Sequence, residues 1–469
     1  MVMLQVEEST RPPLATRPVS SVPSTIDNKT YGLMLLEEAQ RLHRSLAATR
    51  RSPNIIPTLE FCQLSFFIYA CHAALMHHSQ AFFFLREATT LYMLLRREDL
   101  APEQALLADR LFWALVVSER SHAIRYRRPI TLQITSSSPP PVSVSEENLL
   151  PHHHYQQQQQ QHAISTDGGR DIADPAMTGF RCLAALFRPL DTFFIALHGQ
   201  EEILGFAMVP LEALDGVEAG IDAALGNAAD PGLLRLVHGL QDVQKANLRV
   251  TQAWLRIVVW QLRLRLGHLI DDGTAAAASS STAAAAAAAA VHNRHPQNSI
   301  HSIMNHDDAT TAIGTTSGNT NVNMTSDAPP QVHTLGTTTT TAAAAASSTV
   351  NAGANANSRT YRYPLAVARD LALWTRDLPL AALAVHGAGI TEKLFDVACA
   401  VVNVLARVPV VDVNTRAAAE ADFVLLRGLI TRLPGGSAVY AELLEKHVRT
   451  TTTTVMPGVD GGGGGSWTS

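Results

Sequence analysis

Cysteine is scarce in this chain, and its spacing excludes two kinds of protein. Only four cysteines occur in 469 residues, and no two of them are separated by two residues, as zinc-binding pairs usually are. We therefore predict neither a disulfide framework nor a zinc site. Their apolar neighbours indicate buried free thiols in a reducing compartment. The four are Cys62, Cys71, Cys182 and Cys399.

An excess of positive charge is also missing. Lysine and arginine number 36 against 41 aspartates and glutamates, which leaves a net charge of -5. A protein that binds DNA by itself is usually basic, because neutralising phosphate dominates its affinity. The composition therefore does not favour DNA binding by this chain alone.

The chain also lacks a signal peptide pattern and a convincing membrane span. Residues 1–8 are too short for a signal peptide and turn acidic at once. Residues 61–85 contain no Lys, Arg, Asp or Glu, but they include histidines, glutamines and serines that would be costly in hydrocarbon. We predict two buried helices here with a break near Ser79, in an intracellular protein with no membrane partner.

Familiar catalytic motifs are missing as well, since the chain has no P-loop, G-x-S-x-G or H-E-x-x-H sequence. The glycines at 387–389 resemble the start of a dinucleotide fingerprint, but Glu392 replaces the third glycine and no strand precedes them. A turn between helices is predicted instead. Histidines cluster at 152–154 and 292–306, in low-complexity sequence that holds no fixed ligand geometry. We expect no enzyme, no catalytic residues and no metal or cofactor site.

What the chain does contain is three ordered blocks separated by two low-complexity inserts. The homopolymer tracts, such as glutamines 156–161 and alanines 283–290, cannot bury enough apolar surface to offset chain entropy. The predicted division is a disordered linker at 1–29, helical parts at 30–135, 175–270 and 359–450, disordered inserts at 136–174 and 271–358, and a disordered tail at 451–469.

The ordered blocks have apolar residues at helical spacing and show no alternating strand with a convincing hairpin turn. The predicted fold class is all-α, built from stacked helical hairpins. Pro57 and Pro102 are placed as first helical residues, and Pro129 is expected to end the helix that Pro102 opens. The predicted helices are 61–74, 81–95, 102–129, 243–270, 365–376 and 390–407.

One leucine series admits two interpretations. Leu248, Leu255, Leu262 and Leu269 recur every seven residues, which is the spacing of a coiled-coil dimer. However, the apolar face also includes Trp254 and is too wide for a narrow zipper seam. We favour a buried core helix, and a homodimer remains the alternative.

A basic group closes the predicted helix before Pro129. Arg120, Arg125, Arg127 and Arg128 make this end net positive, so it suits either phosphate contact or a helix C-terminus, where cations offset the dipole. We favour structural roles for all four. Helical spacing places Arg120 near the apolar face, which makes a buried pair with a carboxylate plausible there.

Several segments, taken in their order along the chain, resemble one protein family. The pattern begins at 86–90, continues through 112–129 from an aromatic start to a basic end closed by proline, and resumes at 248–262 and 363–399. It resembles the middle homology region of fungal transcription activators of the binuclear zinc-cluster family, in the starch- and maltose-responsive subgroup that includes the amylase regulator. The signature residues, expected to be structural, are Arg86, Glu87, Trp113, Glu119, Arg120, Arg127, Arg128 and Pro129.

This resemblance implies a regulator of genes for carbohydrate breakdown. Its expected location is the nucleus, and exchange with the cytoplasm is left open. Its expected partners are a sugar-derived inducer and the RNA polymerase II transcription machinery. The family pattern places a six-cysteine cluster with two zinc ions near the N-terminus, and this sequence has none. Zinc and promoter DNA are therefore expected only through a missing N-terminal domain. The alternative is an α-helical interaction module without DNA binding, acting as a competitor of a full-length regulator.

Overall fold

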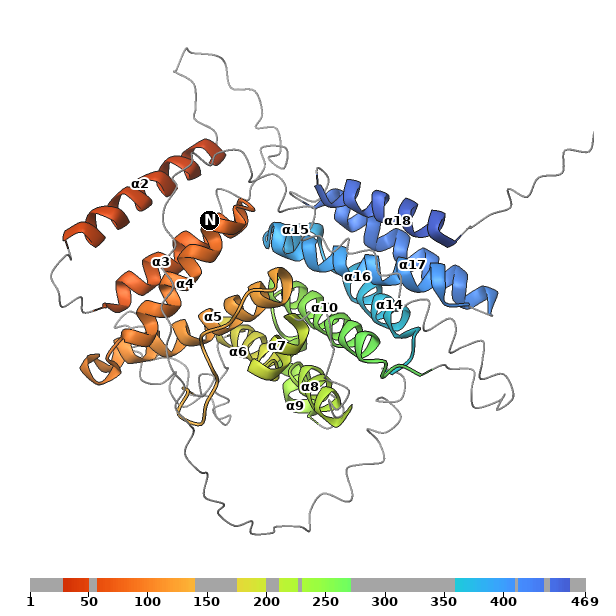
Figure 1. The fold of residues 1–469 in the computed structure, drawn as a ribbon, viewed down its shortest axis with the longest axis horizontal. Helices are drawn as coiled ribbons and strands as arrows, with labels where there is room; N and C mark the ends of the chain where they lie inside the picture. Colours follow the sequence, from red (N-terminus) through yellow and green to blue (C-terminus); the bar gives the residue numbers. More distant parts are fainter. Residues whose placement is uncertain are drawn as a thin grey trace, which may run out of the picture. The chain divides into compact units, whose positions relative to one another are not determined.

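The computed structural model describes residues 28–49, 57–139, 175–199, 211–226, 230–270, 359–409, 412–433 and 439–455. The described helices belong to one compact unit, formed by residues 1–270 and 361–469. A second unit, residues 271–360, lies almost wholly outside the described residues. No β-strand occurs in the part of the chain that the structure describes, which confirms the predicted all-α class (Figure 1).

The helices follow the predicted blocks. The first block contains α2 (Asn28–Thr49), α3 (Leu59–Ala74), α4 (His78–Leu94) and α5 (Pro102–Tyr126). The second contains α6 (Pro175–Phe187), α7 (Thr192–Gly199), α8 (Leu211–Ala223), α9 (Pro231–His238) and α10 (Asp242–Leu266). The third contains α14 (Tyr363–Arg376), α15 (Leu380–Ala384), α16 (Ala388–Arg407), α17 (Val413–Arg432) and α18 (Ala441–Val455).

The predicted disordered segments lie mostly outside the described residues, and two of their boundaries need correction. Helix α2 begins at Asn28, inside the predicted linker, and α18 continues to Val455, inside the predicted tail. Residues 136–139 of the first predicted insert are also described, and the Pro139 carbonyl accepts a hydrogen bond from Trp113 of α5. The helical blocks therefore extend slightly beyond the predicted limits at both ends of the chain.

The predicted pair of helices is confirmed, and the break between α3 and α4 falls at residues 75–77, slightly before Ser79. Met76 adopts a left-handed φ of 58°, and the His77 amide donates to the His72 carbonyl at 2.9 Å. Ser79 therefore lies in the first turn of α4. Pro57 also precedes the extended N-cap Thr58 rather than starting the helix itself.

Two glycines illustrate how the helix ends are set. Gly387 has a φ of 60°, which disfavours any side chain, and it is the N-cap of α16. This confirms the predicted turn between helices. Gly267 has a φ of 70° and ends α10 at Leu266, four residues before the predicted limit. At α5, Arg127 takes the left-handed C-cap conformation, so the helix ends before Pro129.

Helix α10 is the central helix of the unit. It packs against α6 and α8 from its own block and against α14, α15 and α16 from the third block (Figure 1). Leu248, Leu255 and Leu262 are buried in it, and so is Trp254. This confirms the interpretation of the leucine series as a core helix, because its apolar face is buried against other helices of the same chain.

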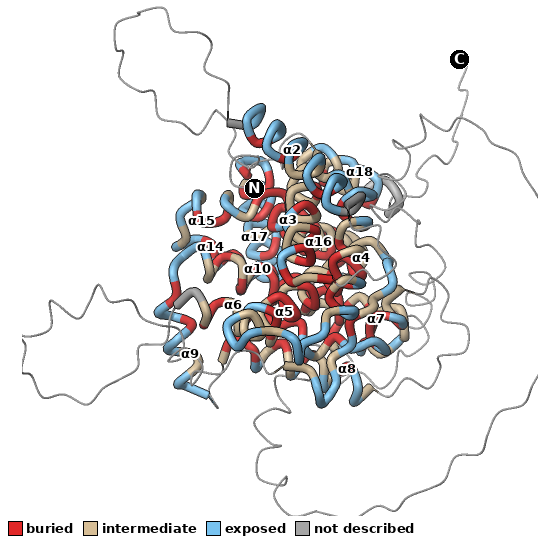
Figure 2. Tube along the Cα trace, turned by 90° about the vertical axis from the view of Figure 1, so that its left-hand side faces the viewer, coloured by how far each residue is buried: buried red, intermediate tan, exposed pale blue. Residues whose placement is uncertain are grey.

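Among the buried residues of the first two blocks, two hydrophobic clusters share α5. One cluster joins α3, α4 and α5 around Trp113, and the other joins the last turns of α5 to α6, α7, α8 and α10 around Leu255. Figure 2 shows the buried, red stretches of α5, α10 and α16 inside the exposed helical surface. None of the four cysteines, all within the described ranges, forms a disulfide: Cys62 and Cys182 are buried, and Cys71 and Cys399 are partly buried.

Helix length and hydropathy bear on the predicted absence of a membrane span. Among the described helices, none combines the length and apolar character that crossing a membrane requires.

Candidate functional site

Two of the signature residues, Arg86 of α4 and Glu119 of α5, form an ion pair in which the carboxylate is buried. The Glu119 side chain is 2% exposed, and its carboxylate lies 2.9 Å from the Arg86 guanidinium of α4. The backbone amides of Thr131 and Leu132 each donate to it at 2.8 Å, and the Thr131 hydroxyl also bonds to it. A buried carboxylate with this many donors holds the segment after α5 against the helix pair. Glu119 and Arg86 therefore join α4, α5 and the segment after α5.

Two more signature residues fasten neighbouring segments. Glu87 lies 2.9 Å from His43 of α2 and accepts a hydrogen bond from Ser65 of α3 at 2.9 Å, so it joins three helices. The Trp113 indole donates to the Pro139 carbonyl at 3.1 Å, which holds the chain beyond α5. Both side chains thus act on the scaffold.

Arg120 is buried as predicted, but its partner differs from the expected carboxylate. The side chain is 1% exposed, and its Nε donates to the Leu190 carbonyl at 2.7 Å. A longer bond at 3.4 Å reaches the Leu132 carbonyl. Neither carbonyl belongs to a helix, so no helical amide occupies it. Burial lowers the pKa of Arg120 to about 10.

The remaining basic residues divide into exposed and buried groups. Arg127 caps α5, and Arg128 is exposed, with its guanidinium carbon 5.1 Å from the centre of the Phe82 ring. The Pro129 carbonyl accepts from Arg86 at 3.4 Å. Arg125, in contrast, points into the protein, with 11% of its side chain exposed. Grouping Arg125 with a solvated helix end was therefore wrong, because the end of α5 packs against α16.

Arg125 is the centre of what we call the charged cluster, formed with Glu392, Lys393 and Asp396 of α16. Arg125 lies 3.0 Å from the Glu392 carboxylate and 3.5 Å from that of Asp396. Asp396 also accepts the Trp254 indole N–H at 2.9 Å. The cluster therefore connects α5, α10 and α16, which come from all three blocks of the chain.

Two tyrosines complete the coordination of Glu392. The Tyr126 hydroxyl donates to its Oε1 at 3.2 Å, and the Tyr440 hydroxyl donates to the same atom at 2.5 Å. Burial and the charge of Glu392 raise the pKa of both tyrosines well above the usual value. Both phenols are therefore neutral donors at physiological pH, and both oxygens of Glu392 have partners, the tyrosines at Oε1 and Arg125 at Oε2.

Lys393 differs from the other members because no carboxylate pairs with it among the described side chains. Its Nζ donates to the Thr251 hydroxyl at 2.8 Å and lies 5.6 Å from the centre of the Trp254 ring. Burial and then repulsion by Arg125 lower the pKa of Lys393 to about 7. The amine therefore changes charge near neutral pH, with hydrogen-bonding capacity left over.

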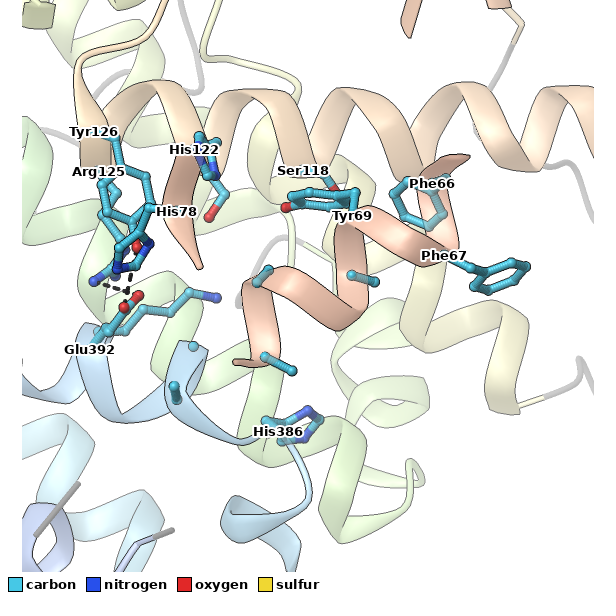
Figure 3. A pocket seen from close by; sticks show the side chains of 17 residues that line it. Phe66, Phe67, Tyr69, His78, Ser118, His122, Arg125, Tyr126, His386 and Glu392 are labelled. Atoms are coloured by element: carbon cyan, nitrogen blue, oxygen red, sulfur yellow. Dashed lines mark hydrogen bonds and ion pairs between the residues drawn. The ribbon is translucent and has the colours of Figure 1, made fainter. Parts of the chain in front are cut away.

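The charged cluster borders a cavity of about 390 Å³, which we call the aromatic pocket. It lies between α3, α4 and α5 on one side and the start of α16 on the other. Figure 3 shows Arg125, Tyr126 and His78 near Glu392 at one end, and Phe66, Phe67 and Tyr69 at the other. Its lining side chains are Phe66, Phe67, Tyr69, His78, Ser118, Ser121, His122, Arg125, Tyr126, His386, Glu392 and Lys393, with small residues between them.

The chemistry of the pocket suits binding of a polar ring-shaped molecule. Aromatic side chains offer flat apolar contact, while a few polar groups fix orientation. His386 donates to the Val243 carbonyl at 2.8 Å, and burial lowers the pKa of its imidazole, so its second nitrogen is an acceptor. Burial also raises the pKa of Tyr69 to about 12.

The sequence analysis did not identify this site. Arg125 was considered only as part of the basic group at the end of α5, Tyr126 was not selected, and Glu392 was noticed only as a departure from a glycine pattern. Tyr126 and Glu392 are 266 positions apart, so no local spacing relates them. The buried side of α16, which carries Glu392 beside Leu394 and Phe395, was the available signal.

Two further observations bear on the chemistry. No group of three or more histidine, cysteine, aspartate or glutamate side chains that could hold a metal occurs within the described ranges, and the histidines at 152–154 and 292–306 lie outside them. Comparison of the chain with protein-family models, with curated proteins and with solved structures found no match.

Proposed function

We propose that this chain is the regulatory and effector region of a fungal zinc-cluster transcription factor that controls genes for starch- or maltose-type carbohydrate breakdown. The order of sequence segments that resemble this family supports the proposal. The observation that carries it is the aromatic pocket at the contact of α5 with α16, because a ligand there touches helices from the first and third blocks.

The pocket supplies a means of ligand response. A ligand shifts a protein between two states only if it binds them with different affinity. A ligand seated between α3–α5 and α16 favours the arrangement in which these helices lie together. Sugars combine apolar ring faces with hydroxyl groups, and these match the aromatic wall and the donors near Lys393. We therefore assign the aromatic pocket to a sugar-derived inducer.

The test joins the full chain to a foreign DNA-binding domain and measures a reporter gene. We expect transcription to rise when cells grow on an inducing sugar, such as maltose, and to stay low on a non-inducing carbon source. A fusion that accumulates in the nucleus but stays silent on every sugar would contradict the proposal.

A pair of matched variants locates the response. Ser121→Trp places a large side chain at the wall of the aromatic pocket, and we expect it to abolish sugar dependence. Thr90→Trp makes the same type of change on the exposed surface of α4 and should leave the response intact. If both variants respond to sugar equally, the sugar response does not depend on this pocket.

A second function, an α-helical interaction module without DNA binding, is favoured by one surface of α2. Leu36 and His43 face the body of the protein, whereas Tyr31, Leu35 and Leu42 are between 45% and 49% exposed. Their spacing of four and seven places these three on one stripe of the helix. An exposed apolar stripe is typical of contact with another protein.

The native transcript distinguishes these two functions. If it continues upstream of Met1 in frame and encodes six closely spaced cysteines among basic residues, the transcription-factor proposal holds. If the transcript encodes no such cluster, the interaction module takes its place.

A further inference from the structure

A second, smaller cavity lies between α10 and α14. It is lined by a different set of α10 residues from Trp254, which contacts Lys393 of α16. Its volume is about 210 Å³, and its wall is mostly polar. We call it the arginine pocket, after two arginines that lie seven positions apart on α10. The side chains that matter for its chemistry are Arg249, Gln252, Arg256, Asp370 and Trp374.

The two arginines have unequal partners. Arg256 lies 2.7 Å from the Asp222 carboxylate and 3.8 Å from that of Asp370. Arg249 donates to the Gln252 side-chain carbonyl at 3.3 Å, and no described carboxylate lies within the 4.0 Å of an ion pair. One arginine of the pocket is therefore neutralised, while the other keeps N–H donors that no acidic side chain occupies.

Neighbouring side chains hold Arg249 in position. Its guanidinium carbon lies 4.0 Å from the centre of the Trp374 ring, which covers one side of the cation. Trp374 in turn stacks on His238 of α9 at 5.7 Å. Gln252 donates to the Ile221 carbonyl at 3.1 Å, which directs its oxygen toward Arg249. The cation is thus fixed before any ligand arrives, which lowers the entropic cost of binding.

The local charges favour an incoming anion at Arg249. Burial lowers the pKa of this guanidinium, and repulsion by Arg256 adds to the effect, while Asp370 acts in the opposite direction. An arginine remains charged in any case. Its planar donors match the two oxygens of a carboxylate or a phosphate.

We infer that the arginine pocket binds a small molecule through one phosphate or carboxylate group, with Arg249 as the bidentate donor and Trp374 beside the anion. Gln252 is a positioning residue, because it acts through Arg249. The pocket volume suffices for the anionic group and a small body attached to it. This site is independent of the aromatic pocket and of the proposed sugar response.

The test measures binding of inorganic phosphate, acetate and glucose 6-phosphate to the purified full chain by calorimetry. We expect saturable binding of at least one oxyanion, weakened by added salt because the contact is electrostatic. Binding of phosphate and glucose 6-phosphate but not acetate identifies a phosphate site, and the reverse identifies a carboxylate site. Absence of saturable binding of all three would overturn the inference.

Two variants of opposite sign sharpen the test. Arg249→Gln removes the charge and should weaken binding at least tenfold. Asp370→Asn removes the competing carboxylate and should strengthen binding severalfold. Arg416→Gln, at an exposed ion pair on α17, is the control and should leave binding unchanged. Equal affinity of Arg249→Gln and the unmodified chain would refute the assignment.

Folding of the variants is checked by circular dichroism. If Arg249→Gln does not fold, Arg249→Lys keeps the cation but loses the fork of paired donors, and it should weaken binding severalfold. Failure of this site would leave the sugar-dependent reporter response unaffected, so the two proposals fail separately.

Discussion

Two pairs of neighbouring residues near the end of α5, Glu119 with Arg120 and Arg125 with Tyr126, have different roles. Glu119 and Arg120 bind scaffold segments: Glu119 pairs with Arg86 of α4 and accepts from the Leu132 amide, and Arg120 donates to the Leu190 carbonyl. Arg125 and Tyr126, less than two turns later, reach α16 across the whole chain and border a cavity. The comparison teaches that the signature residues hold the scaffold together, while the candidate site uses residues that lie between them on the same helix.

The largest effect is expected at the scaffold end. Glu119→Gln leaves Arg86 without its buried partner and weakens the bonds from Thr131 and Leu132. We expect the free energy of unfolding to fall by about 4 kcal/mol, because breaking a buried ion pair typically costs ~3–5 kcal/mol. Urea unfolding of the full chain measures it. Glu98→Gln, at a position with 69% side-chain exposure, should change it by less than ~0.5 kcal/mol.

The pocket end should be less important for stability and more important for response. Arg125→Gln separates α5 from Glu392 and Asp396, but Tyr126, Tyr440 and Trp254 still donate to these carboxylates. We expect a loss of about 3 kcal/mol, at the low end for a buried pair, together with loss of sugar-dependent transcription. Glu119→Gln is the control. If Arg125→Gln loses as much stability as Glu119→Gln and keeps the sugar response, the two ends of this part of α5 do not differ in function.

A pH effect distinguishes the pocket end further. The pKa of Lys393 is about 7 in the folded protein, below its ordinary value near 10.4. Between these values the unfolded chain binds more protons at this lysine, so its contribution to stability rises as pH increases from 7 to 10. Lys393→Met should remove that rise in unfolding experiments at pH 7 and pH 9.

The matched control for this pH effect is Lys446→Met, at an exposed position of α18. It should follow the unmodified chain at both pH values. A Lys393→Met protein with the same pH dependence as the unmodified chain would show that Lys393 keeps an ordinary pKa.

The smallest effect is expected at the exposed end of the basic group. Arg128→Gln loses only the contact of a solvated guanidinium with Phe82. We expect a stability change of ~0.5–1 kcal/mol, the usual value for an exposed cation–π pair. Binding of random-sequence DNA should be the same for both proteins, and a marked loss of DNA binding in the variant would assign Arg128 a phosphate contact instead.

The parts of the fold that could be predicted depend on local sequence. The leucines of α10 recur at a spacing that any helix converts into one apolar face, and Gly387 can start a helix because it tolerates a positive φ. The burial of Arg120 could likewise be predicted from the helical spacing of apolar residues in α5. Its partners could not, because the Leu190 carbonyl comes from a segment 70 positions away.

Helix periodicity, capping and composition thus determined the all-α class and the core face of α10, since these depend on contacts within a few turns. The contacts of the signature residues are not local in this sense, since Arg86 and Glu119 lie 33 positions apart. Only the tertiary structure decided that Arg125 meets Glu392, that Lys393 is left without a carboxylate and that Arg249 lies against Trp374. The physical reason is that burial and pairing of a charge depend on which distant helices pack together, and side-chain spacing along one helix carries no record of that choice.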